Sequence, residues 1–250
     1  MSGVQSVDRA ITSLELIAER GEAGIGELAT ALGVHTSTVS RLLGVLADHG
    51  LIEQVDGGGT YRLGFALIPL AGRVAERLEV TTHAHPICAD LAARLGETVT
   101  IAIPDRGRAV TVDQARGPAM VTAHNWLGRS TPLHNTSTGK VLLAAVGAAD
   151  PDALATALAP ETHLSRRALR ALAAELAQVA ARGYAWALEE YEPGLHAVAA
   201  PIHGPDGAVI AALSVSGPAY RLSAQRITEI APDVVAAGHE ISDRITLHRP

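Results

Sequence analysis

The sequence predicts an α+β protein in which a small helical head precedes a larger domain of strands and helices. Within residues 25–63, two short helical patterns meet at a glycine, and a pattern typical of a β-hairpin follows them. From residue 98 the hydrophobic period changes from helical to alternating, and strand and helix patterns then follow one another to the end. A length of 250 residues is sufficient for two such domains.

Three helices are predicted in the head. Apolar residues recur at helical spacing from 7 to 18, and Gly21 ends this helix. A second helix over 25–32 ends at Gly33, because a residue without Cβ enters the left-handed conformation of a tight turn at little cost. The third helix covers 35–49. This order of helix, tight turn and helix is that of a helix-turn-helix motif.

The third predicted helix has one apolar and one polar face. Val39, Leu42, Leu43 and Leu46 follow the i, i+3, i+4, i+7 spacing of a buried face. The other face carries hydroxyl groups and one guanidinium near the helix start, where helices that read the major groove place such groups. We therefore expect this face to contact DNA through Thr36, Ser37, Thr38, Ser40 and Arg41.

A two-stranded wing is predicted directly after this helix. Residues 51–55 and 60–63 have the pattern of strands, and the Gly-rich segment 56–59 between them tolerates positive φ. We expect Arg62 on the wing and Arg9 on the first helix to contact DNA phosphates. Two alternatives remain open: a helical bundle with a hairpin that binds no DNA, and an adaptor whose head binds protein.

The charge of the head argues against strong binding to arbitrary DNA. Residues 1–80 contain six arginines and no lysine against ten Asp and Glu, a net charge of −4. Most nucleic-acid-binding domains carry a basic surplus instead. We therefore expect modest non-specific affinity, a shallow dependence on salt for each subunit, and two copies acting together.

Composition sets further bounds. Hydrophobic residues make up 48% of the chain but aromatic residues only 3%, so the cores must consist of Ala, Leu, Val and Ile. Cys88 is the single cysteine, which excludes an intrachain disulfide and fits a reducing compartment. We see neither a signal-peptide pattern nor an apolar run long enough for a membrane span. A cytoplasmic protein without membrane contact is expected.

The remaining two-thirds of the chain predict one antiparallel sheet with helices packed around it, the architecture of a ligand-sensing domain. The strongest turn pattern is Gly-Pro-Asp-Gly at 204–207. The predicted helices are 66–78, 82–95, 136–145, 151–158, 166–182 and 223–247, and the predicted strands are 98–103, 108–114, 120–124, 184–189, 197–202 and 209–216.

Several motifs in this order resemble the IclR family of bacterial transcriptional regulators over nearly the whole chain. They include SVDRAITSLELI, STVSRLLGVL, YRLG, LGETVTIAI, STPLHNTSTGKVLLA, RGYAWALEEYEPGLHAVAAPI and AALSVSGPAYRL. The resemblance implies a winged helix-turn-helix DNA-binding domain over 1–65, a linker helix over 66–80 and a GAF-like effector-binding domain over 81–250. It also implies a homodimer or a dimer of dimers on a palindromic operator, a small-molecule effector, usually repression of a metabolic or catabolic operon, and no enzymatic activity.

The same resemblance indicates where an effector binds. At the start of the helix after PLH, hydroxyl groups and free backbone N–H groups form a site suited to a carboxylate, although ordinary N-capping would need only one such residue. Ser214 and Ser216 alternate on one strand and therefore face the same side. The expected effector-binding residues are Asn135, Thr136, Ser137, Thr138, Met120, Trp186, Leu195, His196, Ala197, Ser214 and Ser216.

The chain departs from characterised relatives at two of these positions. Ala187 stands where an acidic residue is frequent, and Ala197 where a cysteine can occur. The absence of this acidic residue and of this cysteine favours a less polar cavity, and hence an effector with apolar or aromatic bulk and one carboxylate. Glu189 and Glu190 are expected near the rim of the site.

The sequence also contains residues that could suggest a metal site, a phosphate-binding loop or an enzyme. His83, His85 and Cys88 are close in sequence, but they stand at a helix start where side chains diverge, so no metal and no cofactor are expected. Lys140 follows a glycine but lacks the earlier glycine and the following Ser or Thr of a phosphate loop. A small-molecule hydrolase with a helical head is the enzyme alternative, yet no nucleophile elbow or catalytic pairing accompanies it.

Overall fold

The computed structural model describes residues 4–55, 58–75, 79–119, 125–147, 151–159 and 162–247. The chain divides into two compact units, Met1–Arg77 and Leu78–Pro250. None of the described helices is long and apolar enough to cross a membrane.

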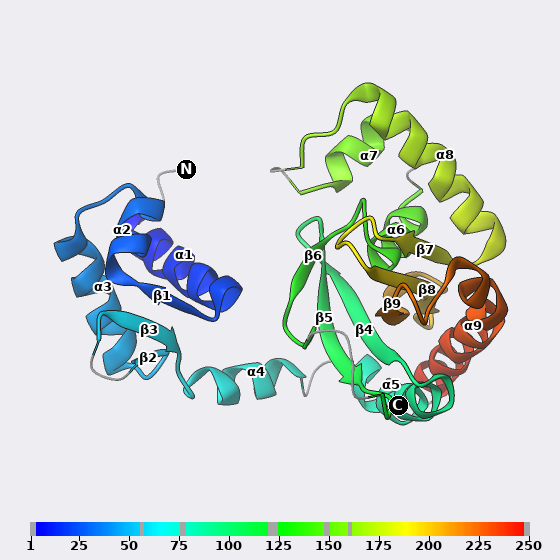
Figure 1. Ribbon diagram of the computed structural model, residues 1–250, viewed down its shortest axis with the longest axis horizontal. Helices are drawn as coiled ribbons and strands as arrows, with labels where there is room; N and C mark the ends of the chain where they lie inside the picture. The colour runs from blue at the N-terminus through cyan, green and yellow to red at the C-terminus, as the bar shows by residue number, and fades with distance from the viewer. Residues whose placement is uncertain are drawn as a thin grey trace. The chain divides into compact units, whose positions relative to one another are not determined.

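The first unit contains four helices and a small sheet within its described residues (Figure 1). The helix α3 packs through Val39 and Leu43, both fully buried, against Ile17 of α1, Leu28 of α2 and Ile52 of β2. The elements are α1 (Gln5–Arg20), β1 (Glu22–Gly24), α2 (Ile25–Leu32), α3 (Thr36–Asp48), β2 (Ile52–Gln54), β3 (Thr60–Leu63) and α4 (Leu67–Ala75).

Two details of this unit explain its geometry. Gly33 adopts the left-handed conformation, with φ of 63°, and so makes the tight turn between α2 and α3. The wing has three strands in the order β1-β3-β2, whereas the sequence predicted two. The strand β1 was missed because three residues are too few to show alternation, and because it forms by pairing Ala23 with Tyr61 far along the chain.

The second unit is built on a six-stranded antiparallel sheet in the order β6-β5-β4-β9-β8-β7. Its strands are β4 (Thr98–Asp105), β5 (Arg108–Ala115), β6 (Ser130–Pro132), β7 (Ala185–Leu188), β8 (Leu195–His203) and β9 (Val209–Pro218). Its helices are α5 (Glu79–Leu95), α6 (Ser137–Ala145), α7 (Pro151–Ala157), α8 (Arg166–Arg182) and α9 (Ala224–Leu247).

The helices cover both faces of this sheet, as Figure 1 shows. On one face α5 and α9 bury Ile101, Leu213 and Val215. On the other face α6, α7 and α8 bury Ala199 and Ala212. Alternate residues of each strand point to opposite faces, so this arrangement leaves the polar residues of β4 and β9 on the α6 side.

Some predicted elements differ from the observed ones. The strand predicted at 120–124 lies outside the described residues. The strand β6 was not predicted, because it is three residues long, ends in proline and forms by pairing with the edge of β5. The strand β8 begins at Leu195 and not at Ala197.

Candidate functional site

The outward face of α3 carries the hydroxyl and guanidinium groups singled out in the sequence. Thr36, Ser37, Ser40 and Arg41 are exposed and Thr38 is half-buried. The opposite face is anchored in the core, although Leu42 is only half-buried and the fully buried anchors are the valine and leucine named above. The polar groups of the helix start are therefore free to meet a partner.

The two other arginines expected to bind DNA have different surroundings. Arg62 lies on the central wing strand and is flanked in register by Glu22 and Glu53. Its Nε donates to Glu53 Oε1 at 2.6 Å, although the arginine side chain is 53% exposed. Arg9 is half-buried on α1. A DNA phosphate near Arg62 would therefore have to compete with a carboxylate that already holds it.

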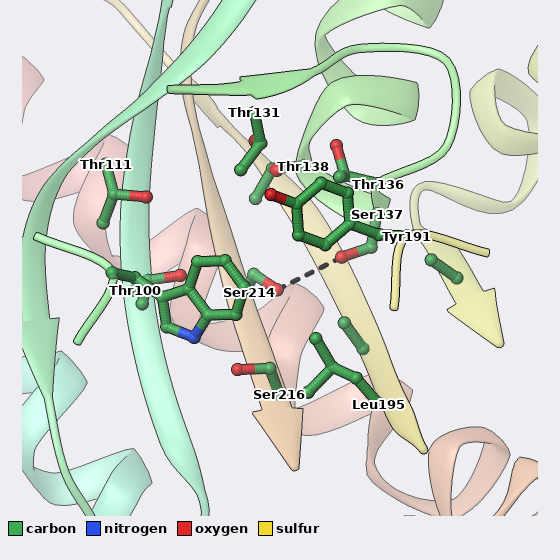
Figure 2. A pocket seen from close by; sticks show the side chains of 13 residues that line it. Thr100, Thr111, Thr131, Thr136, Ser137, Thr138, Tyr191, Leu195, Ser214 and Ser216 are labelled. Carbon is green, nitrogen blue, oxygen red and sulfur yellow. Dashed lines mark hydrogen bonds between the residues drawn. The ribbon is translucent and has the colours of Figure 1, made fainter. Parts of the chain in front are cut away.

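A cavity that opens to solvent lies between the sheet and α6, and its empty space, part of which is solvent at the opening, is about 510 Å³. Figure 2 shows Thr100 and Thr111 on one side of it, Ser137 and Tyr191 on the other, and Ser214 between them. Of the 13 described residues that line the cavity, eight are serine or threonine and none is charged: Thr100, Thr111, Thr131, Thr136, Ser137, Thr138, Ser214 and Ser216. The other five are Trp126, Ala187, Tyr191, Leu195 and Ala197.

The strand register explains why these side chains meet. Ser214 pairs with Thr100 across β9 and β4, and both side chains face the cavity. Ala187 pairs with Ala197 across β7 and β8, so two small side chains lie together on the cavity wall. The cavity is therefore uncharged and rich in hydroxyl groups, and its apolar area comes from the alanines, Leu195 and two aromatic rings.

The start of α6 forms one wall of the cavity. Thr136 caps the helix: its hydroxyl accepts from Gly139 N at 3.1 Å and donates to Pro132 O at 2.7 Å. Ser137 and Ser214 are joined by a hydrogen bond between their hydroxyl oxygens, 3.2 Å apart (Figure 2). The first-turn N–H groups of Ser137 and Thr138 have no acceptor within the helix, so they are available to an anion.

Three residues expected in this site lie elsewhere. Strand alternation turns His196 and Trp186 away from the cavity while their neighbours face it. His196 Nδ1 donates to Leu222 O at 2.8 Å, and Trp186 stacks against the Arg182 guanidinium at 3.6 Å. Asn135 donates from Nδ2 to Glu190 O at 3.3 Å and is not part of the lining. Met120, also expected, lies outside the described residues.

Sequence reasoning missed six of the lining residues. Thr100 could have been found, because it alternates with the buried Val99 and Ile101 on one strand. Trp126 and Tyr191 come from loops, where no periodicity marks a side chain's direction; their ring centroids lie 5.9 Å apart at a tilted angle. The remaining missed residues are Thr111, Thr131 and Ala187.

A charge cluster with a buried lysine at its centre lies on α6, the helix whose start forms one wall of the cavity. Lys140, the chain's single lysine, is 1% exposed. Its Nζ donates to Glu175 at 2.7 Å, to Glu190 at 2.6 Å and to Trp186 O at 3.2 Å. Two carboxylates thus neutralise the ammonium, which ties α6 to α8 and to the 189–194 loop that carries Tyr191.

His134 stands beside this cluster. The pKa of His134 lies below its ordinary value. Burial is the main cause and the charge of Lys140 adds to it, whereas the charge of Glu190 opposes it. Its Nδ1 is buried and makes no hydrogen bond within the described part of the chain. The neutral imidazole is therefore the favoured form in the folded protein.

The histidine and cysteine motif of α5 shows no metal geometry. His85 Nδ1 bonds to Asp113 Oδ1 at 2.9 Å, and burial raises the pKa of the Cys88 thiol. Among the described residues, no group of three or more His, Cys, Asp or Glu side chains could hold a metal ion.

Each of the two units matches a known protein family. The IclR helix-turn-helix domain matches residues 6–56, and the bacterial transcriptional regulator IclR C-terminal domain matches residues 72–243. The transcriptional regulator XynR of Escherichia coli K12 is 34% identical and covers 96% of each chain. The transcriptional repressor IclR of the same organism is 31% identical over 96% of this chain and 89% of its own.

Solved structures share the fold. An IclR-type transcriptional regulator from Silicibacter superposes with a TM-score of 0.75 at 29% identity, covering 96% of each chain. An IclR homologue from Microbacterium hydrocarbonoxydans in complex with 4-hydroxybenzoate has a TM-score of 0.77 at 22% identity and covers 98% of this chain and 100% of its own. With an exposed helix-turn-helix face, a hydroxyl-lined cavity and matches over both units, the chain belongs to the IclR family of transcriptional regulators, which bind DNA and are not enzymes.

Proposed function

We propose that this protein represses a metabolic or catabolic operon from the cytoplasm, as a homodimer or dimer of dimers on a palindromic operator. A small organic or aromatic acid in the cavity of the second unit controls that binding. The observation that carries the proposal is the cavity itself, which is uncharged and lined by eight serine and threonine residues beside a helix start.

The lining supports an acid with a flat or apolar body. The N–H groups of Ser137 and Thr138 at the start of α6 can donate hydrogen bonds to a carboxylate, as can hydroxyl groups beside them. No lining side chain among the described residues supplies a cation. The tilted Trp126 and Tyr191 rings offer an aromatic surface, and the paired Ala187 and Ala197 leave room against the sheet. A protein of the same fold binds 4-hydroxybenzoate, an acid of this kind.

The DNA contacts are assigned to the first unit. Thr36, Ser37, Thr38, Ser40 and Arg41 read base edges and phosphates from the exposed start of α3. Arg62 on the wing and Arg9 on α1 approach the phosphate backbone of the DNA. Since Arg62 already binds Glu53, its contact adds little affinity, in keeping with the acidic charge of the head.

Control by the ligand requires two arrangements of the subunits that bind the effector with different affinity. The contacts around the cavity indicate where such a change in arrangement could begin. A ligand at the start of α6 touches the helix that holds Lys140. Lys140 in turn holds Glu190, the neighbour of Tyr191, and Tyr191 lies on the same side of the cavity as Ser137 (Figure 2). Occupancy therefore acts on α6, α8 and the 189–194 loop together.

The effector arm is tested by calorimetric titration of the intact protein with aliphatic keto acids, benzoates and the matching benzamides. We expect a benzoate to bind and its neutral amide to bind at least ten-fold more weakly. Ser137→Ala should weaken binding of the acid, whereas Thr156→Ala, which removes an exposed hydroxyl on α7, should not. Tight binding of small keto acids alone would reject the aromatic body.

The DNA arm is tested by electrophoretic shift with the promoter regions of the neighbouring genes. Arg41→Ala should lower specific binding at least ten-fold and leave the effector affinity unchanged, because the two sites are in separate units. Unaltered operator affinity in this variant would remove α3 from the proposed interface.

A further inference from the structure

We infer that the third turn of α3 extends the base-reading face, with Val45 contacting the methyl group of a thymine and Gly44 allowing the helix backbone to lie close to the base edges. This inference rests on the proposed use of α3 as the recognition helix. It assigns sequence discrimination to two residues that carry no hydrogen-bonding or charged side chain.

Helical geometry places both residues on the outward side. At 100° per residue, Gly44 lies only about 20° from the direction of Ser37, and Val45 follows Arg41 by one turn. Val39 and Leu43, which are fully buried, point the other way. Ser37, Arg41, Gly44 and Val45 are accordingly all exposed, and they form one continuous strip on α3.

The length of the strip matches the groove. From Ser37 to Val45 the helix rises about 12 Å, which is about the width of the major groove of B-DNA. Asp48 is exposed one turn further on and carries the charge that phosphates repel. The strip that can face DNA therefore ends near Val45.

Nothing in the described part of the chain requires a glycine at position 44. A glycine in a helix interior destabilises the helix relative to alanine, because it has more backbone entropy to lose. A Cβ built on Gly44 would meet no described atom within 4 Å, and the residue has no positive φ. Neither packing nor backbone conformation among the described residues requires glycine here. Gly72 of α4 shares this property, but of the two only Gly44 lies on the exposed strip of α3, where a residue without Cβ lets a partner approach the helix backbone closely.

Val45 has the matching chemistry. It is 58% exposed on a helix whose other outward residues up to this point are polar or glycine. An isopropyl group cannot read hydrogen-bond donors or acceptors, but it can bury a methyl group. In the major groove only thymine presents one. The pair therefore favours a thymine at one position of each half-site.

The test for Val45 removes single methyl groups from the DNA. An operator duplex is selected from random sequence with the intact protein, and each thymine of one half-site is replaced in turn by deoxyuridine. We expect at least one replacement to weaken wild-type binding about four-fold, the equivalent of one buried methyl group. Val45→Ala should abolish the penalty at that thymine, while Val146→Ala, an exposed valine of the other unit, should retain it. An equal penalty in Val45→Ala, or no methyl penalty at any thymine, overturns the assignment.

The test for Gly44 separates folding from binding. Gly44→Ala should raise the unfolding temperature of the first unit and lower operator affinity at least ten-fold. Gly72→Ala on α4, where a Cβ also meets nothing within 4 Å, should stabilise without that loss. Full operator affinity in Gly44→Ala refutes the close approach. If Arg41→Ala abolishes binding while Gly44 and Val45 variants do not, only this inference fails; if Arg41→Ala binds normally, the proposed recognition helix fails.

Discussion

Gly139→Ala is the most direct test of how α6 is held against the cavity. A Cβ at this position would lie 2.3 Å from both Cα and O of Leu133, backbone atoms that a rotamer change cannot move. Ordinary contact begins at 3.4 Å, so α6 and the Leu133 segment would have to separate by about 1 Å. Overpacking of this kind costs about 3 kcal/mol, and the better helix propensity of alanine returns about 1 kcal/mol. We expect a net loss of about 2 kcal/mol in the free energy of unfolding.

The assay is urea and thermal unfolding of the intact protein, followed by titration with an acid that binds the wild type. For a unit of this size, the loss corresponds to a lowering of the melting temperature by about 4–8 °C. Ligand affinity should fall as well, because Ser137 and Thr138 move with the helix. Gly72→Ala is the matched control and should be more stable than the wild type. A Gly139→Ala protein with wild-type stability and ligand affinity would refute the reasoning.

Three further predictions follow from the charges. Lys140→Met leaves two carboxylates unpaired; because each is about one-third exposed, we expect a loss of about 2 kcal/mol rather than the full cost of a broken buried pair, measured by urea unfolding. Glu53→Gln releases Arg62 and removes a negative charge from the wing, so non-specific DNA affinity and its dependence on salt should both increase; an unchanged salt titration would contradict this. Burial lowers the pKa of His134, so below about pH 6.5 the unfolded chain binds a proton that the folded chain does not, and stability falls as the pH drops through this range. His134→Gln should lose less stability than the wild type between pH 7.5 and 5.5, and an identical loss would argue against it.

The lining of the cavity shows which side chains of a strand can be predicted from the sequence and which cannot. The prediction named Leu195, His196 and Ala197 together, but only alternate residues of a strand share a face, so the histidine points away. Resemblance identified the segment, and the pleat of the strand decided which of its side chains enter the site.

Features with a local cause could be predicted from the amino-acid sequence. Apolar spacing specified α3 and its exposed polar face, Gly33 specified the turn before it, and the change of period at residue 98 marked the start of the sheet. These features follow from interactions between residues a few positions apart, and such interactions do not depend on the rest of the fold.

The remaining lining residues of the cavity, and the contacts among all of them, depend on the tertiary fold. Ser137 and Ser214 are 77 positions apart and meet because β9 lies in the middle of the sheet beneath α6. Trp126 and Tyr191 lie next to each other although they come from separate loops. Lys140 binds the carboxylates of Glu175 on α8 and of Glu190 in the loop after β7. Such contacts depend on strand order and on the packing of all layers at once, and no local pattern in the chain encodes them.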